Sequence, residues 1–324
     1  MRLLVRLHGS SRALALGEAE TLAGGPAREL GRRWLVAEAA DWHPLARMGL
    51  ASLLLEHLGT AEGPALPFDP REAVAGPYAV VVHRQHTRPE RERELSVQLV
   101  DLVWHGLAEP RVDLATPVTE LHAIVDGERA WWGRLLHRFD RSGFDWREPR
   151  RRPFWRSISM DPRRSRALVN LTAIRPGERL LDPFCGTGSY LVEGALLGAH
   201  VMGSDVDPRV AGGARRNLEH VGAAGEVRVM DARHLERWGM GVDAIVTDLP
   251  YGRSATLRQE ARRLYAEFLA SAARVLRPGG HVVVMHPKDD LPEPPRSLRT
   301  VRRLEEAVHD SLTREVHVMV SAPS

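Results

Sequence analysis

Repeated strand–loop–helix units constrain the fold of this 324-residue chain more than any other feature. The clearest unit covers residues 179–196, where an apolar run ends at Asp182 and a Gly-x-Gly turn opens an apolar-periodic helix. Glycine lets the backbone of such a turn approach a ligand closely. Three later apolar runs also end in an acid, at Asp205, Asp231 and Asp248. The pattern predicts an α/β domain with a doubly wound, mostly parallel sheet of the Rossmann-like type.

These four acids are expected to line one crevice, because ligands of open α/β sheets bind outside the carboxyl ends of the parallel strands. Two kinds of cofactor, NAD and a methyl donor, are candidates for this crevice. An NAD site would need an acid about 20 residues after the glycine loop, and Asp205 meets this condition. It would also need the third glycine of the G-x-G-x-x-G fingerprint, but Leu191 occupies that position. The segment Asp248-Leu249-Pro250-Tyr251 has no use in hydride transfer. A methyl donor is therefore the favoured cofactor.

That segment suits methyl transfer to an exocyclic amine of a nucleic-acid base. Such an amine shares its lone pair with the ring and is a poor nucleophile. Two hydrogen-bond acceptors, predicted to be the Asp248 carboxylate and the Leu249 carbonyl, favour a pyramidal nitrogen whose lone pair points at the donor. Pro250 fixes the turn, and Tyr251 is expected to stack on the base, a contact worth ~1–3 kcal/mol. Orientation and electrostatics should supply most of the rate, because the sulfonium is already activated.

Four segments resemble the archaeal tRNA guanine-N2 methyltransferases, a family that modifies guanosine 10 and carries a THUMP domain. They are Asp182–Gly188, Gly203–Asp207, Thr247–Ser254 and, as the last block, Ser311–Arg314. The resemblance implies S-adenosylmethionine as cofactor, tRNA as partner, and one or two methyl groups added to N2 of guanosine 10. A guanine in a stem hides its amine, so the base should be flipped into the pocket at a cost of a few kcal/mol. Leu249 departs from the proline of many relatives but keeps a carbonyl.

The predicted site residues gather at the strand ends. We expect Asp205 to hold the ribose hydroxyls of the cofactor, Asp231 its adenine amine, and Asp182 its amino group. The whole predicted cofactor set is Asp182, Phe184, Gly186, Thr187, Gly188, Asp205, Val206, Asp231 and Ala232. The predicted catalytic set is Asp248, Leu249, Pro250 and Tyr251. No metal site is predicted, because the only cysteine, Cys185, reads as a pocket-lining residue and the histidines form no motif.

Four segments are predicted along the chain. Their order is 1–59, a ferredoxin-like region; 60–140, a THUMP RNA-binding domain; 141–166, a basic linker; and 167–324, the methyltransferase domain. A strand at 78–82 and a hairpin around Asp126-Gly127 support the α+β character of the N-terminal half. Leucines at helical spacing predict a helix over 44–58, and a further helix is predicted over 300–308.

The stretch 141–166 is the most polarised part of the chain, with nine arginines against three acids. Arginine forks suit phosphates, and interleaved aromatic rings suit bases. We expect Arg150, Arg151 and Arg152 to face RNA while Phe154 and Trp155 pack on the catalytic domain. Arg253 is another candidate RNA contact. A plain interdomain linker is the alternative for the stretch, and a surface salt bridge is the alternative for Arg253.

The composition of the chain argues against a membrane-spanning or a secreted protein. No apolar run approaches the ~20 residues that span a bilayer, and charge breaks the N-terminus too early for a secretory signal. A single cysteine excludes an intrachain disulfide, so a cytoplasmic location is predicted. The net charge of +3 is modest, although the pI near 9.5 permits an anionic partner. The sequence leaves open whether the chain acts as a monomer or needs a small activator subunit.

Two rival functions stay open at this point. Adenine-N6 methyltransferases of DNA also use a D-x-P-Y segment, as can other nucleic-acid amino-methyltransferases acting on rRNA. The N-terminal half argues against the DNA enzymes, which use different target-recognition domains. An RNA-binding protein with an inactive methyltransferase fold is the second rival, and the intact Asp248 and glycine loop argue against it.

Overall fold

The computed structural model describes residues 1–9, 11–85, 89–140, 142–157, 159–250, 255–309 and 312–322. Contacts divide the chain into two units, each described by itself. Unit 1 comprises Met1–Gly9, Ala23–Arg47 and Ala51–Asp140. Unit 2 comprises Ser10–Leu22, Met48–Leu50 and Arg141–Ser324. The division into four segments stays a prediction.

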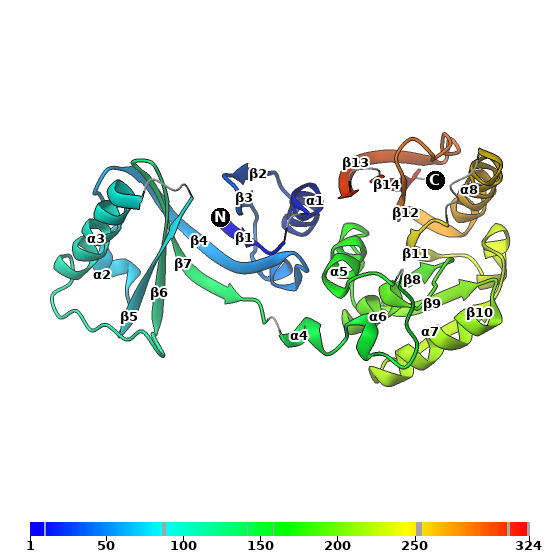
Figure 1. Cartoon of the computed structure of the whole chain (residues 1–324), viewed down its shortest axis with the longest axis horizontal. Coiled ribbons are helices and arrows are strands. Elements are labelled where there is room, and N and C mark those ends of the chain that lie inside the picture. The colour runs from blue at the N-terminus through cyan, green and yellow to red at the C-terminus, as the bar shows by residue number, and fades with distance from the viewer. Residues whose placement is uncertain are drawn as a thin grey trace. The chain divides into compact units, whose positions relative to one another are not determined.

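Unit 1 is built on one seven-stranded sheet of order β2-β3-β1-β4-β7-β6-β5 (Figure 1). Its strands are β1 (Arg2–Leu7), β2 (Ala27–Leu30), β3 (Trp34–Glu38), β4 (Ala51–Glu62), β5 (Tyr78–Arg84), β6 (Thr119–Asp126) and β7 (Arg129–Arg138). The β5–β6 pair is parallel, and the other neighbouring pairs are antiparallel. The predicted hairpin is confirmed, because Asp126 pairs with Arg129 across a turn in which Gly127 has φ +62°.

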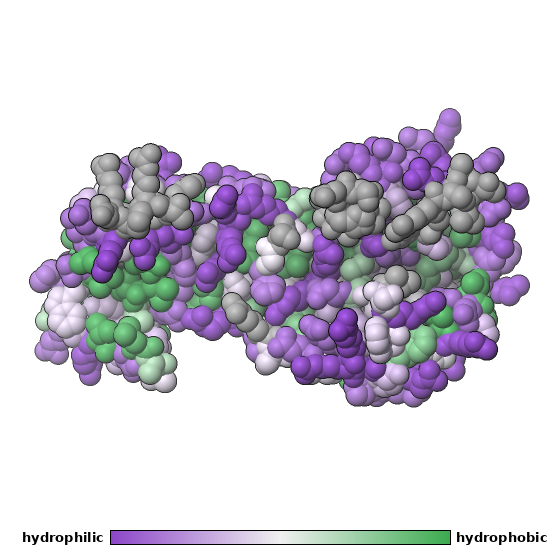
Figure 2. Space-filling model, viewed as in Figure 1, coloured by the Kyte–Doolittle hydropathy of each residue, from purple (hydrophilic) through white to green (hydrophobic). Residues whose placement is uncertain are grey.

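Three helical segments accompany this sheet: η1 (His43–Arg47), α2 (Pro70–Ala73) and α3 (Pro89–His105). The buried stripe of α3, Leu95, Leu99 and Val103, packs in one core with Trp132 of β7. The same helix leaves Trp104 44% exposed. Figure 2 shows apolar residues gathered on the viewed face of unit 1, whereas hydrophilic residues predominate on the viewed face of unit 2.

The helix predicted over 44–58 is wrong, because its second half is the strand β4. Leu53 and Leu55 enter one apolar core, while Leu54, which points to the opposite face, is also fully buried. Both faces of the strand are covered, so its sequence shows a continuous apolar run rather than an alternation. Periodicity cannot distinguish such a run from a buried helix.

Unit 2 contains the predicted α/β domain, and its sheet has the order β10-β9-β8-β11-β12-β14-β13 (Figure 1). Its strands are β8 (Arg179–Asp182), β9 (His200–Asp205), β10 (Gly225–Val229), β11 (Val242–Asp248), β12 (Leu276–Pro287), β13 (Leu298–His309) and β14 (Leu312–Ser321). The strands from β10 to β12 are parallel, and β14 runs antiparallel to both of its neighbours. The predicted fold class, a Rossmann-like and mostly parallel sheet, is confirmed.

Helices cover both faces of this sheet. The helices of unit 2 are α1 (Arg12–Ala23), α4 (Ser142–Asp145), η2 (Pro149–Arg151), α5 (Pro162–Leu171), α6 (Ser189–Leu196), α7 (Pro208–His220), η3 (Ala232–Trp238) and α8 (Ala255–Val275). Successive side chains of a strand point to opposite faces. Leu180 accordingly lies against Gly194 of α6, whereas Leu181 enters the core formed with η3 and α8. No helix of the described residues is both long and apolar enough to cross a membrane.

The helix predicted over 300–308 is also wrong, since β13 occupies this segment. Half-buried Thr300, Arg302 and Leu304 alternate with exposed Val301 and Arg303, which is the period of a strand. The alternation is hard to see in the sequence because charged residues stand on both faces. Such charges are typical of an edge strand, where they discourage pairing with another chain.

Candidate active site

The glycine loop joins β8 to α6 at the carboxyl end of the sheet. Gly186 and Gly188 have φ values of +51° and +78°, in the region that side chains disfavour. The Gly186 N–H donates to Asp205 Oδ2 at 3.2 Å, and the Cys185 N–H donates to the Ser204 carbonyl at 2.8 Å. The loop is therefore tied to the end of β9. A Cβ atom at Gly186 would meet only the Phe184 carbonyl, at 3.9 Å, so this stretch presents bare backbone to open space.

Asp182 lies beneath this loop and is only 1% exposed. Its Oδ1 accepts hydrogen bonds from Thr247 Oγ1 at 2.8 Å and from the Phe184 N–H at 3.3 Å. Burial raises the pKa of Asp182 to about 8, and the charges of Asp205 and Asp248 act in the same direction. This corner of the site is therefore short of positive charge, which suits a cationic ligand.

Asp248 stands at the end of β11, where a second set of contacts holds it. Its Oδ2 accepts a hydrogen bond from Arg314 Nη1 at 3.1 Å. Its Oδ1 is buried and has no hydrogen-bond partner among the residues that the structure describes. Burial raises the pKa of Asp248 to about 6, against the opposing charge of Arg314. One oxygen is thus fixed by arginine and the other is available to a ligand.

The two residues after Asp248 are anchored through their backbones. The Leu249 N–H donates to the Met285 carbonyl at 2.9 Å, and the Leu249 side chain is 1% exposed. The Tyr265 hydroxyl of α8 donates to the Pro250 carbonyl at 2.5 Å. Tyr251 is predicted to stack on the target base and Arg253 to contact RNA, but both lie outside the described residues.

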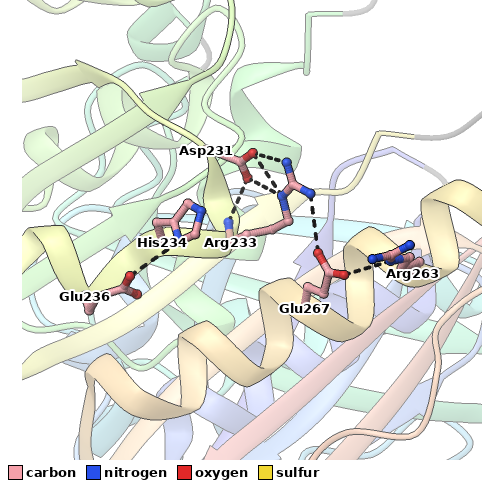
Figure 3. A network of polar contacts seen from close by, with 6 residues as sticks. All are labelled: Asp231, Arg233, His234, Glu236, Arg263 and Glu267. Carbon is pink, nitrogen blue, oxygen red and sulfur yellow. Dashed lines mark hydrogen bonds and ion pairs between the residues drawn. The ribbon is translucent and has the colours of Figure 1, made fainter.

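Asp231 follows β10 and belongs to the polar network in Figure 3. Its carboxylate caps η3 by accepting the Arg233 N–H at 2.9 Å, and both of its oxygens pair with the Arg233 guanidinium. Arg233 also lies 3.5 Å from Glu267 of α8, which pairs with Arg263. The Arg233 hydrogen bond lowers the pKa of Asp231. The carboxylate therefore stays ionised and fixed at the cavity wall.

These strand ends surround a cavity of about 680 Å³, within the range of small-molecule sites. Its walls include Phe184, Gly186, Asp205, Val206, Asp231 and Ala232 of the predicted cofactor set. They also include Asp248, Leu249 and Pro250 of the predicted catalytic set. A second cavity of about 120 Å³ shares Phe184, Gly186 and Asp248 with the first and adds Asp182 and Thr187. Gly188, the N-cap of α6, lines neither cavity.

The sequence reasoning missed several cavity residues. Arg156, Arg233, Leu264 and Arg314 line the larger cavity. Tyr190 lines the smaller one, and its buried hydroxyl has no hydrogen-bond partner within the described part of the chain. Arg314 lies in the last block of the family resemblance and Arg156 in the basic stretch 141–166, but neither was assigned to the site.

The prediction that Arg152 faces RNA is corrected. Arg152 is 4% exposed, and it donates to the Arg147 carbonyl at 2.8 Å and to Ser189 Oγ at 3.0 Å. Arg150 and Arg151 are exposed. Phe154 packs against Gly213, but Trp155 is 49% exposed rather than packed, and the Arg150 guanidinium lies 5.8 Å from its ring centre. An exposed arginine–tryptophan pair thus stands where the sequence predicted an RNA contact.

This fold and this strand-end site define a Rossmann-like methyltransferase domain. The family model described as "RMKL-like, methyltransferase domain" matches residues 149–315. The chain therefore belongs to this family. It is also similar to proteins that are named tRNA guanine-N2 methyltransferases.

A Methanothermobacter thermautotrophicus protein named tRNA (guanine(10)-N2)-dimethyltransferase is 40% identical over 215 residues, which are 64% of this chain and 63% of that protein. The chain thus spans a little under two thirds of this archaeal relative. A Thermus thermophilus protein named tRNA (guanine(6)-N2)-methyltransferase is 31% identical over 268 residues, 78% of this chain and 77% of that protein. The crystal structure of TrmN from Thermus thermophilus aligns over 99% of both chains with a TM-score of 0.55 and 25% identity.

Proposed function

We propose that this protein transfers a methyl group from S-adenosylmethionine to the exocyclic N2 of a guanosine in tRNA. The observation that carries the proposal is the state of Asp248. This carboxylate has one oxygen held by Arg314 and the other buried without a partner among the described residues, in a cavity that the glycine loop also lines. A buried acceptor without a partner is costly unless a ligand supplies the hydrogen.

The residues of the cavity fit S-adenosylmethionine. Asp182, raised to a pKa of about 8 by burial, gains a counter-charge when a cationic amino group binds near it. We propose that Asp205 accepts hydrogen bonds from the ribose hydroxyls and Asp231 from the adenine amine, because both line the cavity, and the bare backbone at Gly186 permits close approach. When bound, the cofactor supplies an electrophilic methyl group on a sulfonium.

The chain's own residues orient and deprotonate the amine. Asp248 Oδ1 and the Leu249 carbonyl are proposed to accept the two amine hydrogens, which turns the nitrogen lone pair toward the donor. The nitrogen must lose one proton after it gains the methyl group, and we propose that Asp248, whose pKa is about 6, takes it. Tyr251 stacking on the base stays a prediction.

Guanosine 10 is the proposed target because the relative with 40% identity carries that position in its name. Guanosine 6 is a second candidate, since the relative named for it matches a larger share of both chains. Unit 1 and the exposed Arg150 and Arg151 are proposed to bind tRNA. We further propose that the protein works in the cytoplasm, as a monomer or with a small activator subunit.

Nucleoside mass spectrometry of tRNA incubated with the protein and S-adenosylmethionine tests this function. The expected product is N2-methylguanosine or its dimethyl form, and sequencing of nuclease fragments of the tRNA then separates position 10 from position 6. Methyladenosine in duplex DNA would instead favour the adenine-N6 rival. Failure to bind S-adenosylmethionine would favour the RNA-binding rival.

Replacement of Arg150 and Arg151 by glutamine is expected to weaken tRNA binding about 10-fold. The slope of the logarithm of the binding constant against the logarithm of the salt concentration should fall by roughly 1 to 2, as for the loss of one to two phosphate contacts. The reason is that both exposed side chains are proposed to neutralise phosphates. Filter binding at several salt concentrations measures both quantities. The double variant of Arg296 and Arg299, also exposed arginines of unit 2, is the control and should bind as the natural protein does. Equal binding by both double variants would remove the linker from the RNA interface.

Tyr265→Phe is expected to lower kcat about 3- to 10-fold with little change in the KM for S-adenosylmethionine. The substitution removes the hydroxyl that holds the Pro250 carbonyl and leaves the ring in its core. Steady-state methyl transfer measures the effect, and Tyr78→Phe, at a buried tyrosine of unit 1, is the control. An unchanged kcat would show that this anchor does not position the catalytic segment.

A further inference from the structure

Three potential metal ligands lie together on β12 and β14, outside the cavity described above. They are His286, Glu315 and His317, and their nearest ligand atoms are all within 4.8 Å of one another. The antiparallel register explains this cluster, because His286 pairs with Glu315 and, two residues further along, Val284 pairs with His317. Residues two apart on a strand share one face of the sheet. Three side chains from two paired strands thus converge on one point.

Three of the four ring nitrogens of these buried imidazoles lack the hydrogen-bond partner that buried polar atoms usually have, as far as the structure describes the chain. His286 and His317 are 0% and 6% exposed. Nε2 of His286 and both ring nitrogens of His317 have no hydrogen-bond partner among the described residues. Nearly all buried polar atoms in proteins are bonded, and an exception calls for a water or an ion. The ring contact between the two, at a centroid distance of 4.8 Å, does not satisfy these nitrogens.

The hydrogen bond of the other His286 nitrogen fixes its tautomer. Nδ1 lies 2.7 Å from the Pro287 carbonyl, which can only accept, so Nδ1 carries the hydrogen. Nε2 therefore presents its lone pair to the cluster. A backbone carbonyl bonded to the remote nitrogen is the usual support of a metal-binding histidine.

Glu315 completes the set with a charged oxygen ligand. Its side chain is 14% exposed, and its Oε2 lies 3.6 Å from Nε2 of His317 and accepts the Asp289 N–H at 3.3 Å. The nearby Arg303 opposes a cation, whereas Glu315 and Asp290 favour one. Two imidazoles and one carboxylate suit Zn²⁺ and related transition metals, and Mg²⁺ or Ca²⁺ would prefer an all-oxygen set.

We propose that His286, Glu315 and His317 form a binding site for one divalent transition-metal ion of the zinc class, with a fourth position open to water. Its place in the sheet indicates a structural role. The residue before His286 is Met285, whose carbonyl holds Leu249, and the residue before Glu315 is Arg314, which holds Asp248. A metal here links the two strand ends that support the catalytic segment.

The test is a zinc titration of the full chain after removal of metals by a chelator. We expect one Zn²⁺ per chain in equilibrium dialysis with elemental analysis, and the visible spectrum of a four-coordinate site when Co²⁺ replaces it. Glu315→Gln and His317→Gln should each weaken zinc binding about 10- to 100-fold, whereas His281→Gln, a half-buried histidine of the same strand outside the cluster, should not. Zinc at about 100 times its Kd should raise the unfolding midpoint of the natural protein by several degrees and that of Glu315→Gln much less.

Glu315→Gln keeps the size of the side chain and an acceptor for Asp289, so it is expected to fold. Should a histidine variant fail to fold, the natural protein and Glu315→Gln still decide the question. Absence of stoichiometric zinc on the natural protein would overturn the site and leave buried water or ring packing as the explanation. Zinc that binds equally well to Glu315→Gln would show adventitious binding elsewhere among the histidines. Neither measurement depends on the proposed methyl transfer.

Discussion

Asp248→Asn is expected to lower methyl transfer to tRNA by at least about 100-fold, the loss typical when a preorganised polar group of a catalytic site is removed. Asparagine has nearly the same shape, but it removes the charge and the base that Asp248 offers to the amine. Single-turnover transfer with radiolabelled S-adenosylmethionine measures the rate. Binding of S-adenosylmethionine should change little, because the proposed cofactor contacts come from Asp182, Asp205 and Asp231 instead.

Stability separates this catalytic effect from misfolding. The pKa of Asp248 is raised from 3.8 to about 6, so the folded state holds this proton more tightly than the unfolded chain does. Ionisation of Asp248 therefore leaves the free energy of unfolding unchanged below pH 3.8. It lowers that free energy progressively between pH 3.8 and about pH 6, and by a constant amount at higher pH. At pH 7 the asparagine variant should consequently unfold at a midpoint no lower than the natural protein.

Asp243→Asn is the matched control, because Asp243 lies on the same strand but at its other end, where it bonds the Arg179 N–H. This variant should methylate tRNA at nearly the natural rate. Full activity of Asp248→Asn would contradict the catalytic assignment, and equal losses in both variants would indicate a general defect of β11.

The acids that line the two cavities could be predicted because their position depends on one topological rule. Parallel strands place their carboxyl ends at one edge, so acids at the ends of apolar runs gather without knowledge of any side-chain contact. Asp182, Asp205 and Asp248 were found in this way. The glycine turn could be predicted from its own residues, because its positive φ angles favour residues without a Cβ atom.

Contacts made through long-range register could not be predicted. Arg314 reaches Asp248 across 66 residues because β14 turns back antiparallel beside β12. The metal cluster arises from the same pairing, and no spacing within the sequence announces it. Arg152 shows the converse, since nothing local reveals that an arginine in a basic run is buried beside Ser189.

Arg314→Gln is expected to lower methyl transfer at pH 7 about 10-fold or more while sparing the rate at pH 9. The guanidinium bonds Asp248 and its charge lowers the pKa of that carboxyl, opposing the effect of burial. Without it, the pKa of Asp248 should rise by roughly 2 pH units, so that only about a tenth of the carboxylate is ionised at pH 7, whereas most of it is ionised at pH 9. Transfer rates from pH 5 to 9, at saturating S-adenosylmethionine and tRNA, measure the change.

The sign of this pH dependence distinguishes the proposed role from simple loss of structure. In the natural protein the rate should fall about 10-fold for each pH unit below about 6, because the protonated Asp248 cannot accept the amine hydrogen. In Arg314→Gln the rate should begin to fall at a higher pH. In Arg314→Lys, which keeps the positive charge but not the planar guanidinium, the pH at which the rate begins to fall should return toward 6. Arg299→Gln, at an exposed arginine of β13, should leave the profile unchanged. A uniform loss at every pH would mean that Arg314 supports the strand and does not tune Asp248, whereas a shifted acid limb is a result that only the charge of Arg314 explains.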